Sequence, residues 1–239
     1  MKKVLGIGLM AAALAFVGAP KAEAALAFSF HVCQGAICQD FNAQAVGTTT
    51  IGDYSFSAIG GGINASPTSS SSTSTINVQR ISTTNGLAPL DVWFTVTGYT
   101  LPQGPGYLFD VSLGATETNG GSGSSRDAVS YQAWFSSTNS TGFPPPGSQA
   151  SLTAICTPPS SGTSDSCFND PGAVSVGPGS SLYSIVSETR FLIGLTDTST
   201  FGTTTQASLT AVPEPGTMML FGTGLVGMAT MLRRRMAKK

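Results

Sequence analysis

Leu90-Asp91-Val92-Trp93-Phe94-Thr95-Val96-Thr97 alternates between two kinds of side chain along its whole length. Leucine, valine and phenylalanine take every second position from 90 to 96, and aspartate, tryptophan and threonine take the positions between them. Successive side chains of a β-strand point to opposite faces of the sheet. The segment therefore predicts a strand that has one face in a hydrophobic core.

Short apolar and β-branched segments of this kind recur along the chain, separated by clusters of Gly, Pro, Ser and Asn. They cover residues 26–32, 53–59, 75–81, 90–99, 107–113, 128–135, 150–156, 183–187, 190–195 and 204–212. The spacing is typical of an all-β protein, and we predict an antiparallel, jelly-roll-like β-sandwich. The Ser/Thr-rich stretch 66–75, the Gly/Ser-rich stretch 119–125 and the proline-containing stretch 138–148 are expected to be surface loops or corners.

The N-terminal residues have the three parts of a secretory signal peptide. Lys2 and Lys3 precede an apolar stretch at 4–17, and Ala22-Glu23-Ala24 supplies small residues before a cleavage point. We expect residues 1–24 to form a signal helix that directs the chain to Sec-type export machinery. Residues 25–211 then form one β-sandwich ectodomain, since this length is sufficient for a single sizeable core.

The ectodomain is acidic once both ends of the chain are set aside. Residues 25–211 contain three arginines, no lysine and ten acidic residues, which leaves a net charge of −7. Nucleic-acid binding depends on basic side chains that neutralise phosphates. The composition therefore argues against a nucleic-acid partner.

Four cysteines in an exported chain are typical of disulfides. Cys33 and Cys38 flank a four-residue turn that contains a glycine, and Cys156 and Cys167 flank a ten-residue loop. Three connectivities are possible, and the spacing favours the two local pairs. A zinc site would need more ligands than this pattern offers, because the chain contains one histidine, His31. We expect no metal and no cofactor.

The last residues have three distinct parts. Pro213-Glu214-Pro215 is followed by an apolar run at 217–232 and by a basic end at 233–239 that begins with Arg233, Arg234 and Arg235. As a transmembrane helix the run would span about 24 Å, which is marginal for a bilayer. The arginines resist translocation and would stop transfer at the membrane.

This tail at 212–239 resembles the PEP-CTERM family of exported bacterial proteins, whose sorting motif is matched here by Pro213, Glu214 and Pro215. The resemblance implies recognition by an exosortase, transient anchoring in the inner membrane, and release to the cell surface or extracellular matrix. Proteins of this family are generally linked to exopolysaccharide and biofilm. Extracellular polysaccharide is therefore an expected partner.

No arrangement of residues predicts catalysis. The one histidine lies beside a cysteine on the first strand, and no nucleophile elbow or phosphate-binding loop is found. We expect a non-enzymatic surface or matrix protein with no catalytic residues. Two alternatives remain: a carbohydrate-binding module that stacks glycan on Trp93 or Trp134, and an exported hydrolase with an unrecognised site.

Overall fold

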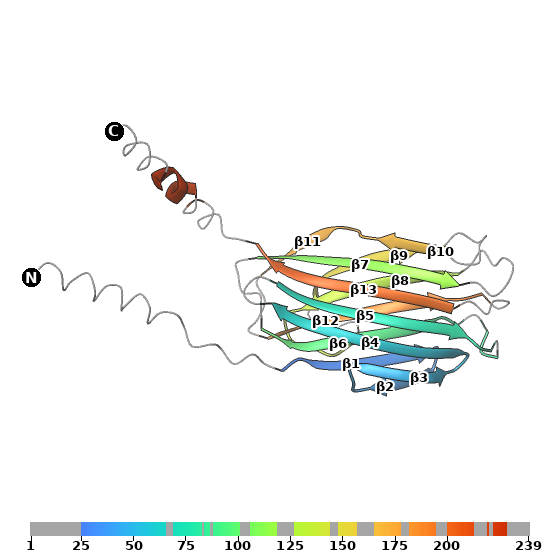
Figure 1. Cartoon of the computed structure of the whole chain (residues 1–239). Coiled ribbons are helices and arrows are strands. Elements are labelled where there is room, and N and C mark those ends of the chain that lie inside the picture. Colours follow the sequence, from blue (N-terminus) through green and yellow to red (C-terminus); the bar gives the residue numbers. More distant parts are fainter. Residues whose placement is uncertain are drawn as a thin grey trace, which may run out of the picture.

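The computed structural model describes residues 25–65, 69–82, 84–86, 88–100, 106–118, 127–143, 148–156, 165–177, 182–194, 200–212, 219 and 222–228. Within these residues the strands form two sheets that lie face to face as two layers (Figure 1). Every strand pair within these residues is antiparallel. The predicted all-β antiparallel sandwich is confirmed.

Sheet A is the layer that contains the first strand. Its order is β2 (Ile37–Phe41), β1 (Ala27–Gln34), β6 (Leu90–Tyr99), β12 (Tyr183–Leu192), β8 (Ala128–Ser136) and β9 (Ser148–Cys156).

Sheet B is the second layer and carries the last strand near its middle. Its order is β10 (Asp165–Asn169), β7 (Tyr107–Thr118), β13 (Thr200–Ala211), β5 (Ser69–Arg80), β4 (Tyr54–Ala65) and β3 (Ala45–Ile51), and β11 (Ala173–Val176) also pairs with β7. Because β13 pairs with β5 on one side and β7 on the other, both of its edges are hydrogen-bonded.

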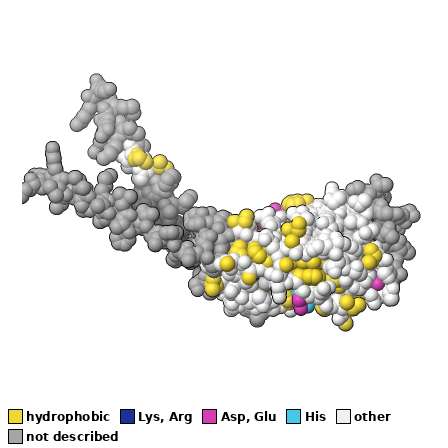
Figure 2. All heavy atoms as spheres, turned by 60° about the horizontal axis from the view of Figure 1, so that its bottom comes forward, with side chains coloured by type: hydrophobic (Ala, Val, Ile, Leu, Met, Phe, Trp, Pro, Cys, Tyr) yellow, Lys and Arg dark blue, Asp and Glu magenta, His cyan; other side chains and the backbone are white. Residues whose placement is uncertain are grey.

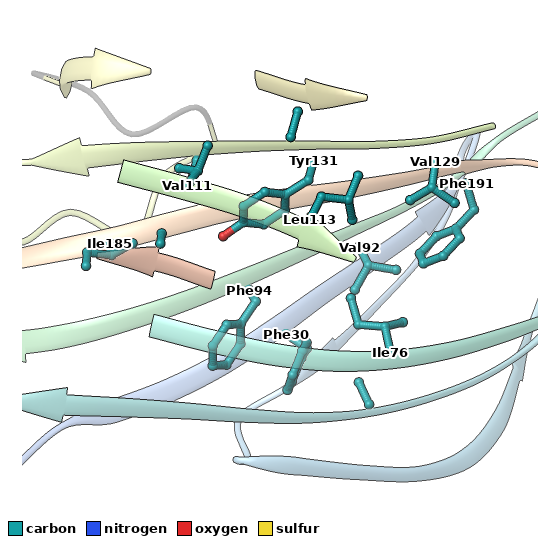
Figure 3. Close-up of a cluster of buried hydrophobic side chains, with 14 of the residues drawn as sticks. Phe30, Ile76, Val92, Phe94, Val111, Leu113, Val129, Tyr131, Ile185 and Phe191 are labelled. Atoms are coloured by element: carbon teal, nitrogen blue, oxygen red, sulfur yellow. The ribbon is translucent and has the colours of Figure 1, made fainter. Parts of the chain in front are cut away.

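The core lies between the two sheets and is built from their inward-facing side chains (Figure 3). The face predicted from residues 90–96 is buried as expected, with Leu90, Val92, Phe94 and Val96 at most 1% exposed. Phe94 of β6 stacks on Phe30 of β1 with ring centroids 4.5 Å apart. Its ring also lies so close to Gly60 of β4 that a Cβ there would meet it at 2.1 Å. Glycine at position 60 thus lets the two sheets approach.

The Ser/Thr-rich stretch differs from its prediction. Residues 69–75 belong to β5 and pair with β4 and β13. The inward-facing Ser70, Ser72 and Ser74 are at most 2% exposed. Their environment is polar, because Tyr183 donates a 2.7 Å hydrogen bond to Ser70 Oγ and Ser74 Oγ lies 2.7 Å from Thr205 Oγ1. The first part of β5, residues 69–75, contains no apolar residue and is stable in the sheet because partners on other strands satisfy its hydroxyls.

Two further differences concern strand number. The segments expected at 183–187 and 190–195 are one strand, β12, because Ser187 and Thr189 face inward without interrupting the pairing. Strands β2, β3, β10 and β11 were not predicted. Each is a short or polar strand at the rim of a sheet, where little apolar surface is buried.

The two expected sorting segments lie largely outside the described residues. This applies to the signal helix at 1–24, the motif at 213–215, the basic end at 233–239 and most of the helix at 217–232. Residues 222–228 are helical. No helix within the described part of the chain has the length and apolar character to cross a bilayer.

Candidate functional site

A row of stacked aromatic rings runs across the outer face of sheet A. Trp93 of β6 stacks on Trp134 of β8, with ring centroids 5.3 Å apart and planes 19° apart. Phe143 lies against Trp93 with centroids 5.1 Å apart. The same phenylalanine stacks on the imidazole of His31, again at 5.1 Å. We call these four residues the aromatic row.

Residues 137–143, which follow β8, fold back over this face. Asn139 Oδ1 accepts a 2.9 Å hydrogen bond from the backbone N–H of Gly98, and the carbonyl of Ser140 accepts a 2.7 Å bond from Ser184 Oγ. The covering explains why Trp134 is only 8% exposed although it points away from the core. Residues 138–143, the described part before β9 of the stretch expected at an edge or corner, therefore form a cover, and Trp134 is closed to a ligand.

Charged side chains lie beside the aromatic row. In the sheet register Glu188 of β12 is opposite Trp93, and Arg190 is opposite Asp91 of β6. Arg190 Nε lies 3.4 Å from Asp91 Oδ1, and the two side chains are 52% and 22% exposed. We call Asp91 and Arg190 the face ion pair.

The surroundings of these carboxyl groups favour their neutral forms. Burial raises the pKa of Asp91, and Arg190 lowers it only in part. Burial, followed by the nearby charge of Asp91, raises the pKa of Glu188, again against the opposing effect of Arg190. Two neighbouring carboxyl groups beside a tryptophan can accept hydrogen bonds from a polar ligand.

His31 contacts an acidic residue and a disulfide at the other end of the aromatic row. Its Nδ1 lies 2.6 Å from Asp40 Oδ1, and its Nε2 lies 3.1 Å from Cys33 Sγ. Figure 2 shows the chain's one histidine beside an acidic side chain, on a face with few other charged side chains. His31 has no hydroxyl nucleophile among its described partners, so a Ser-His-Asp arrangement is not formed by these residues.

A shallow groove lies on the outer face of sheet B. It has a volume of about 570 Å³ and is lined by Gly114, Ala115, Thr116, Ser166, Cys167, Phe168, Gly202 and Thr204. The Phe168 side chain is 71% exposed and stands at one side, opposite Gly114 in the register. Two glycines keep the groove open, and no lining residue is charged. The groove thus combines an exposed ring with hydroxyl groups.

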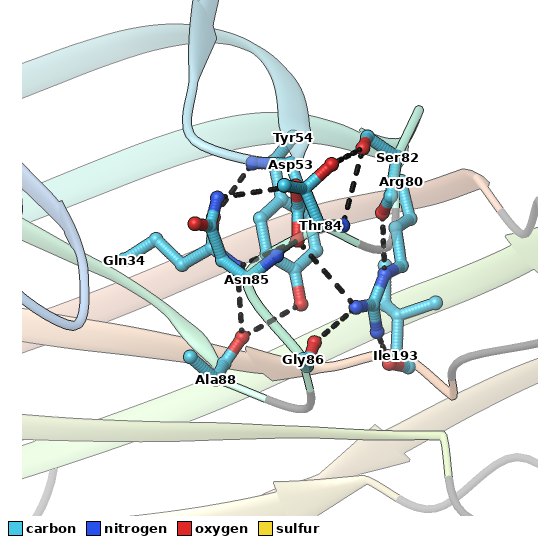
Figure 4. A network of polar contacts seen from close by, with 10 residues as sticks. All are labelled: Gln34, Asp53, Tyr54, Arg80, Ser82, Thr84, Asn85, Gly86, Ala88 and Ile193. Atoms are coloured by element: carbon cyan, nitrogen blue, oxygen red, sulfur yellow. Dashed lines mark hydrogen bonds and ion pairs between the residues drawn. The ribbon is translucent and has the colours of Figure 1, made fainter.

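The largest polar network of the domain is structural. Asp53 accepts hydrogen bonds from the backbone N–H and the side-chain amide of Asn85 and from Gln34, and Arg80 Nη2 lies 3.8 Å from its Oδ2 (Figure 4). Arg80 also donates to the carbonyls of Ser82, Gly86 and Ile193. We call Asp53 and Arg80 the inner ion pair.

Hydrogen bonding decides the charge of the inner pair. Burial alone would raise the pKa of Asp53, but hydrogen bonds led by that of the Asn85 N–H, together with the Arg80 charge, lower it overall. Both side chains are about 1% exposed. Because these groups are occupied with one another, the network joins loops to the sandwich and offers no reactive site.

Both predicted disulfides are present. Cys33 is bonded to Cys38 and Cys156 to Cys167, with Cα–Cα distances of 4.1 Å and 5.8 Å. Trp93 and Trp134 are brought together as a stack, which their sequence separation did not indicate. Sequence reasoning missed Phe143, Glu188 and Phe168. Of these three residues, only Glu188 could have been assigned to an outer face from the sequence, through the alternation of the strand around it.

The C-terminal end of the sandwich leads directly into a recognised motif. A family model described as the PEP-CTERM protein-sorting motif matches residues 211–235, beginning at the last residue of β13. The chain thus contains a PEP-CTERM protein-sorting motif. The motif implies export, transient membrane anchoring and processing by an exosortase, a membrane protein. The individual roles of Pro213, Glu214, Pro215, Arg233, Arg234 and Arg235 stay predictions.

Comparisons with other proteins say little more about this PEP-CTERM protein. No curated protein matches it. A cleaved adhesin domain of Lys-gingipain from Porphyromonas gingivalis is 9% identical, with 65% of this chain and 91% of that chain covered and a TM-score of 0.30. A lipoprotein from Bacteroides thetaiotaomicron is 11% identical, with 81% and 91% covered and a TM-score of 0.26. The adhesin domain of Epf from Streptococcus pyogenes is 13% identical, with 77% and 57% covered and a TM-score of 0.24. Likenesses this weak carry no functional argument.

Proposed function

We propose that this PEP-CTERM protein is a non-catalytic component of the cell surface or extracellular matrix, associated with exopolysaccharide and displayed after exosortase processing. The observation that carries the proposal is the sorting motif at 211–235, which follows β13 without an intervening domain. The sandwich is the part that this tail would deliver.

The polar chemistry of the described residues supports a non-catalytic role. The inner ion pair is buried and occupied by structural hydrogen bonds. The carboxyl groups of Asp91 and Glu188 lie on the outer face of sheet A, beside the aromatic row. If these two groups hydrolysed a substrate, Glu188→Gln would abolish the activity, whereas a binding role would retain most of its affinity.

The sorting part is tested with the full chain in a bacterial host that has an exosortase and in the same host without it. We expect intact mass spectrometry to show loss of residues beyond the motif only when the exosortase is present. A chain with Pro213, Glu214 and Pro215 all replaced by alanine should keep its tail in both hosts. Pro171→Ala, at an exposed loop, is the matched control and should be processed normally.

Persistence of the tail in both hosts would overturn the exosortase proposal. Processing of the triple-alanine chain would show that the three residues are not the recognition element.

A carbohydrate-binding module is the second candidate, and the groove beside Phe168 favours it. An exposed aromatic ring offers a flat apolar surface, and the hydroxyls of Thr116, Ser166 and Thr204 can exchange hydrogen bonds with a sugar. The lining is uncharged, which suits a neutral glycan. Of the two tryptophans proposed from the sequence, Trp134 is buried, so Trp93 is the remaining platform on sheet A.

Adsorption to insoluble neutral polysaccharides distinguishes the two faces. If the groove binds glycan, Phe168→Ala should weaken binding about three- to tenfold, the loss expected for one aromatic contact. Trp93→Ala should have that effect if sheet A provides the platform. Ile59→Ala, which removes a 63% exposed side chain elsewhere on sheet B, is the control. No binding by the parent chain would exclude this candidate for the glycans used.

A further inference from the structure

The disulfide between Cys33 and Cys38 lies at an accessible rim of the fold. The two residues are directly opposite each other in the pairing of β1 with β2, and β2 is the outermost strand of sheet A. Cys38 is exposed, whereas Cys33 is half-buried. A molecule approaching from solvent therefore reaches the Cys38 sulfur first.

The imidazole of His31 is held against the other sulfur. Asp40 binds Nδ1 at 2.6 Å, Phe143 stacks on the ring at 5.1 Å, and Nε2 lies 3.1 Å from Cys33 Sγ. A carboxylate oxygen and a disulfide sulfur can only accept hydrogen bonds. A doubly protonated ring can donate to both partners at once, and in that form its Nε2 places a positive charge beside Cys33 Sγ.

We propose that Cys33–Cys38 is a thiol-exchange site, at which the thiolate of an external cysteine thiol forms a mixed disulfide with Cys38. The attacking sulfur forms a new S–S bond to Cys38 Sγ, and the bond between Cys38 and Cys33 breaks. Its electron pair goes to Cys33 Sγ, which is stabilised by the His31 imidazolium and takes the Nε2 proton. Charge and electrons balance with the thiol as the only co-reactant.

The direction of attack follows from two independent features. Exchange is faster when the attacked sulfur is accessible and when the departing thiolate is stabilised by a nearby cation. Exposure favours attack at Cys38, and the His31 contact favours departure of Cys33. The exchange is reversible, because the Cys33 sulfur remains next to the mixed disulfide at Cys38 and can attack it to re-form the original bond.

The second disulfide is an internal control in the same molecule. Cys156 is 2% exposed, and its bond to Cys167 joins β9 to β10. The chain's one histidine lies at the other disulfide. Cys167 is half-buried at the groove, whereas Cys38 is exposed, and the disulfide between Cys156 and Cys167 has no imidazole beside it.

The test is to incubate the oxidised full chain, kept in detergent, with reduced glutathione or with a neutral cysteine-containing peptide. Free thiols are then alkylated and the adducts are located by peptide mass spectrometry. We expect adducts at Cys38, formed about tenfold faster than at Cys156 or Cys167, the scale that leaving-group stabilisation provides. The ratio of the two probe rates shows whether small thiols or protein thiols are the better partners.

His31→Gln keeps a side chain that can form hydrogen bonds but removes the imidazolium, and it should slow adduct formation about tenfold. Asp40→Asn should have a smaller effect in the same direction, because it removes the charge that orients the ring. Gln39→Ala, on the exposed part of the same strand, should leave the rate unchanged. A thermal unfolding curve for His31→Gln separates a lost fold from a lost contact.

Equal adduct rates at the two disulfides would overturn the proposal. So would adducts mainly at Cys33, or an unchanged rate in a folded His31→Gln chain.

Discussion

The inner and face ion pairs use the same two residue types in opposite surroundings. Asp53 and Arg80 are about 1% exposed and 3.8 Å apart, whereas Asp91 and Arg190 are 22% and 52% exposed and 3.4 Å apart. We expect the closer pair to be the weaker one, because the Arg190 side chain is half exposed to water and few other groups fix the two side chains. The inner pair is bound by surrounding amides and carbonyls. Hydrogen bonding and burial, not the distance between charges, separate a structural pair from a surface pair.

The pKa directions show the same difference. The pKa of Asp53 is lowered by the groups that bind it, and the pKa of Asp91 is raised by burial, which the Arg190 charge offsets only in part. Asp91 Oδ1 also accepts no hydrogen bond from the described residues. The domain thus stabilises charge at one position and leaves it poorly satisfied at another, on the face where the aromatic row lies.

Removing one partner of the inner pair should have the largest effect on stability. Asp53→Ala or Arg80→Leu leaves a buried charge without its partner, and we expect a loss of about 3–5 kcal/mol in the free energy of unfolding. Urea unfolding of the full chain, followed by tryptophan fluorescence, measures it. Arg190→Leu on the face pair is the matched control and should cost less than about 1 kcal/mol. Similar losses for both arginines would remove the distinction between the pairs.

The two aspartates should respond to pH in opposite senses. The folded-state pKa of Asp53 is lowered, so its stabilisation is present above the unfolded pKa of about 4 and is lost as the pH falls through the folded value. The pKa of Asp91 is raised, so its contribution is present below about 4 and is lost as the pH rises through the folded value.

The test is to measure the free energy of unfolding of the parent chain, Asp53→Asn and Asp91→Asn from about pH 2 to about pH 7, in steps of roughly half a unit. The difference in the free energy of unfolding between the parent and Asp53→Asn should become smaller towards low pH. The free energy of unfolding of Asp91→Asn should increase relative to that of the parent as the pH rises. Parallel curves for the two variants would contradict the assigned directions.

Phe143 is the last residue of the cover formed by residues 137–143, and its ring contacts Trp93 and His31. Phe143→Ala removes the stacking on His31 and the tilted ring contact with Trp93, and it should cost about 0.5–1.5 kcal/mol. It should also shift tryptophan fluorescence to longer wavelength, since Trp93 becomes more exposed. Phe168→Ala, which removes a 71% exposed ring, should change neither quantity. An unshifted emission spectrum in Phe143→Ala would show that Phe143 does not shield Trp93.

The smallest effect should come from the direct coupling within the face pair. A double-mutant cycle of Asp91→Ala and Arg190→Ala should give a coupling free energy of about 0.2–1 kcal/mol. Because these charges are partly solvated, the coupling should fall when salt is raised to about 1 M. A coupling that is larger than this and independent of salt would place the pair in the same class as the inner one.

The sequence predicts those features that depend on local patterns. Alternation at 90–97 correctly placed Leu90 and Phe94 in the core and Trp93 on the outer face, and short spacings favoured the two disulfides that are present. The prediction was wrong for residues 69–75, because the partners that satisfy their hydroxyls, such as Tyr183, are distant in the chain.

The candidate site was less accessible to sequence reasoning. Asp53 and Arg80 belong to different strands or turns, and nothing in their neighbours indicates a pair. The cover depends on hydrogen bonds that Asn139 and Ser140 accept from Gly98 and Ser184, which lie on strands far away in sequence. Long-range contacts of this kind, and the strand order within each sheet, follow from tertiary packing.

The position of β13 has a mechanical consequence. The strand is hydrogen-bonded to β5 and β7 along both edges, and the sorting motif begins at its last residue. A pulling force applied through the tail acts along the strand axis and loads these two ladders in shear, so that many hydrogen bonds must break together. An edge strand pulled sideways would instead unzip one bond at a time. A domain tethered by this end would withstand fluid drag until its tether was cut.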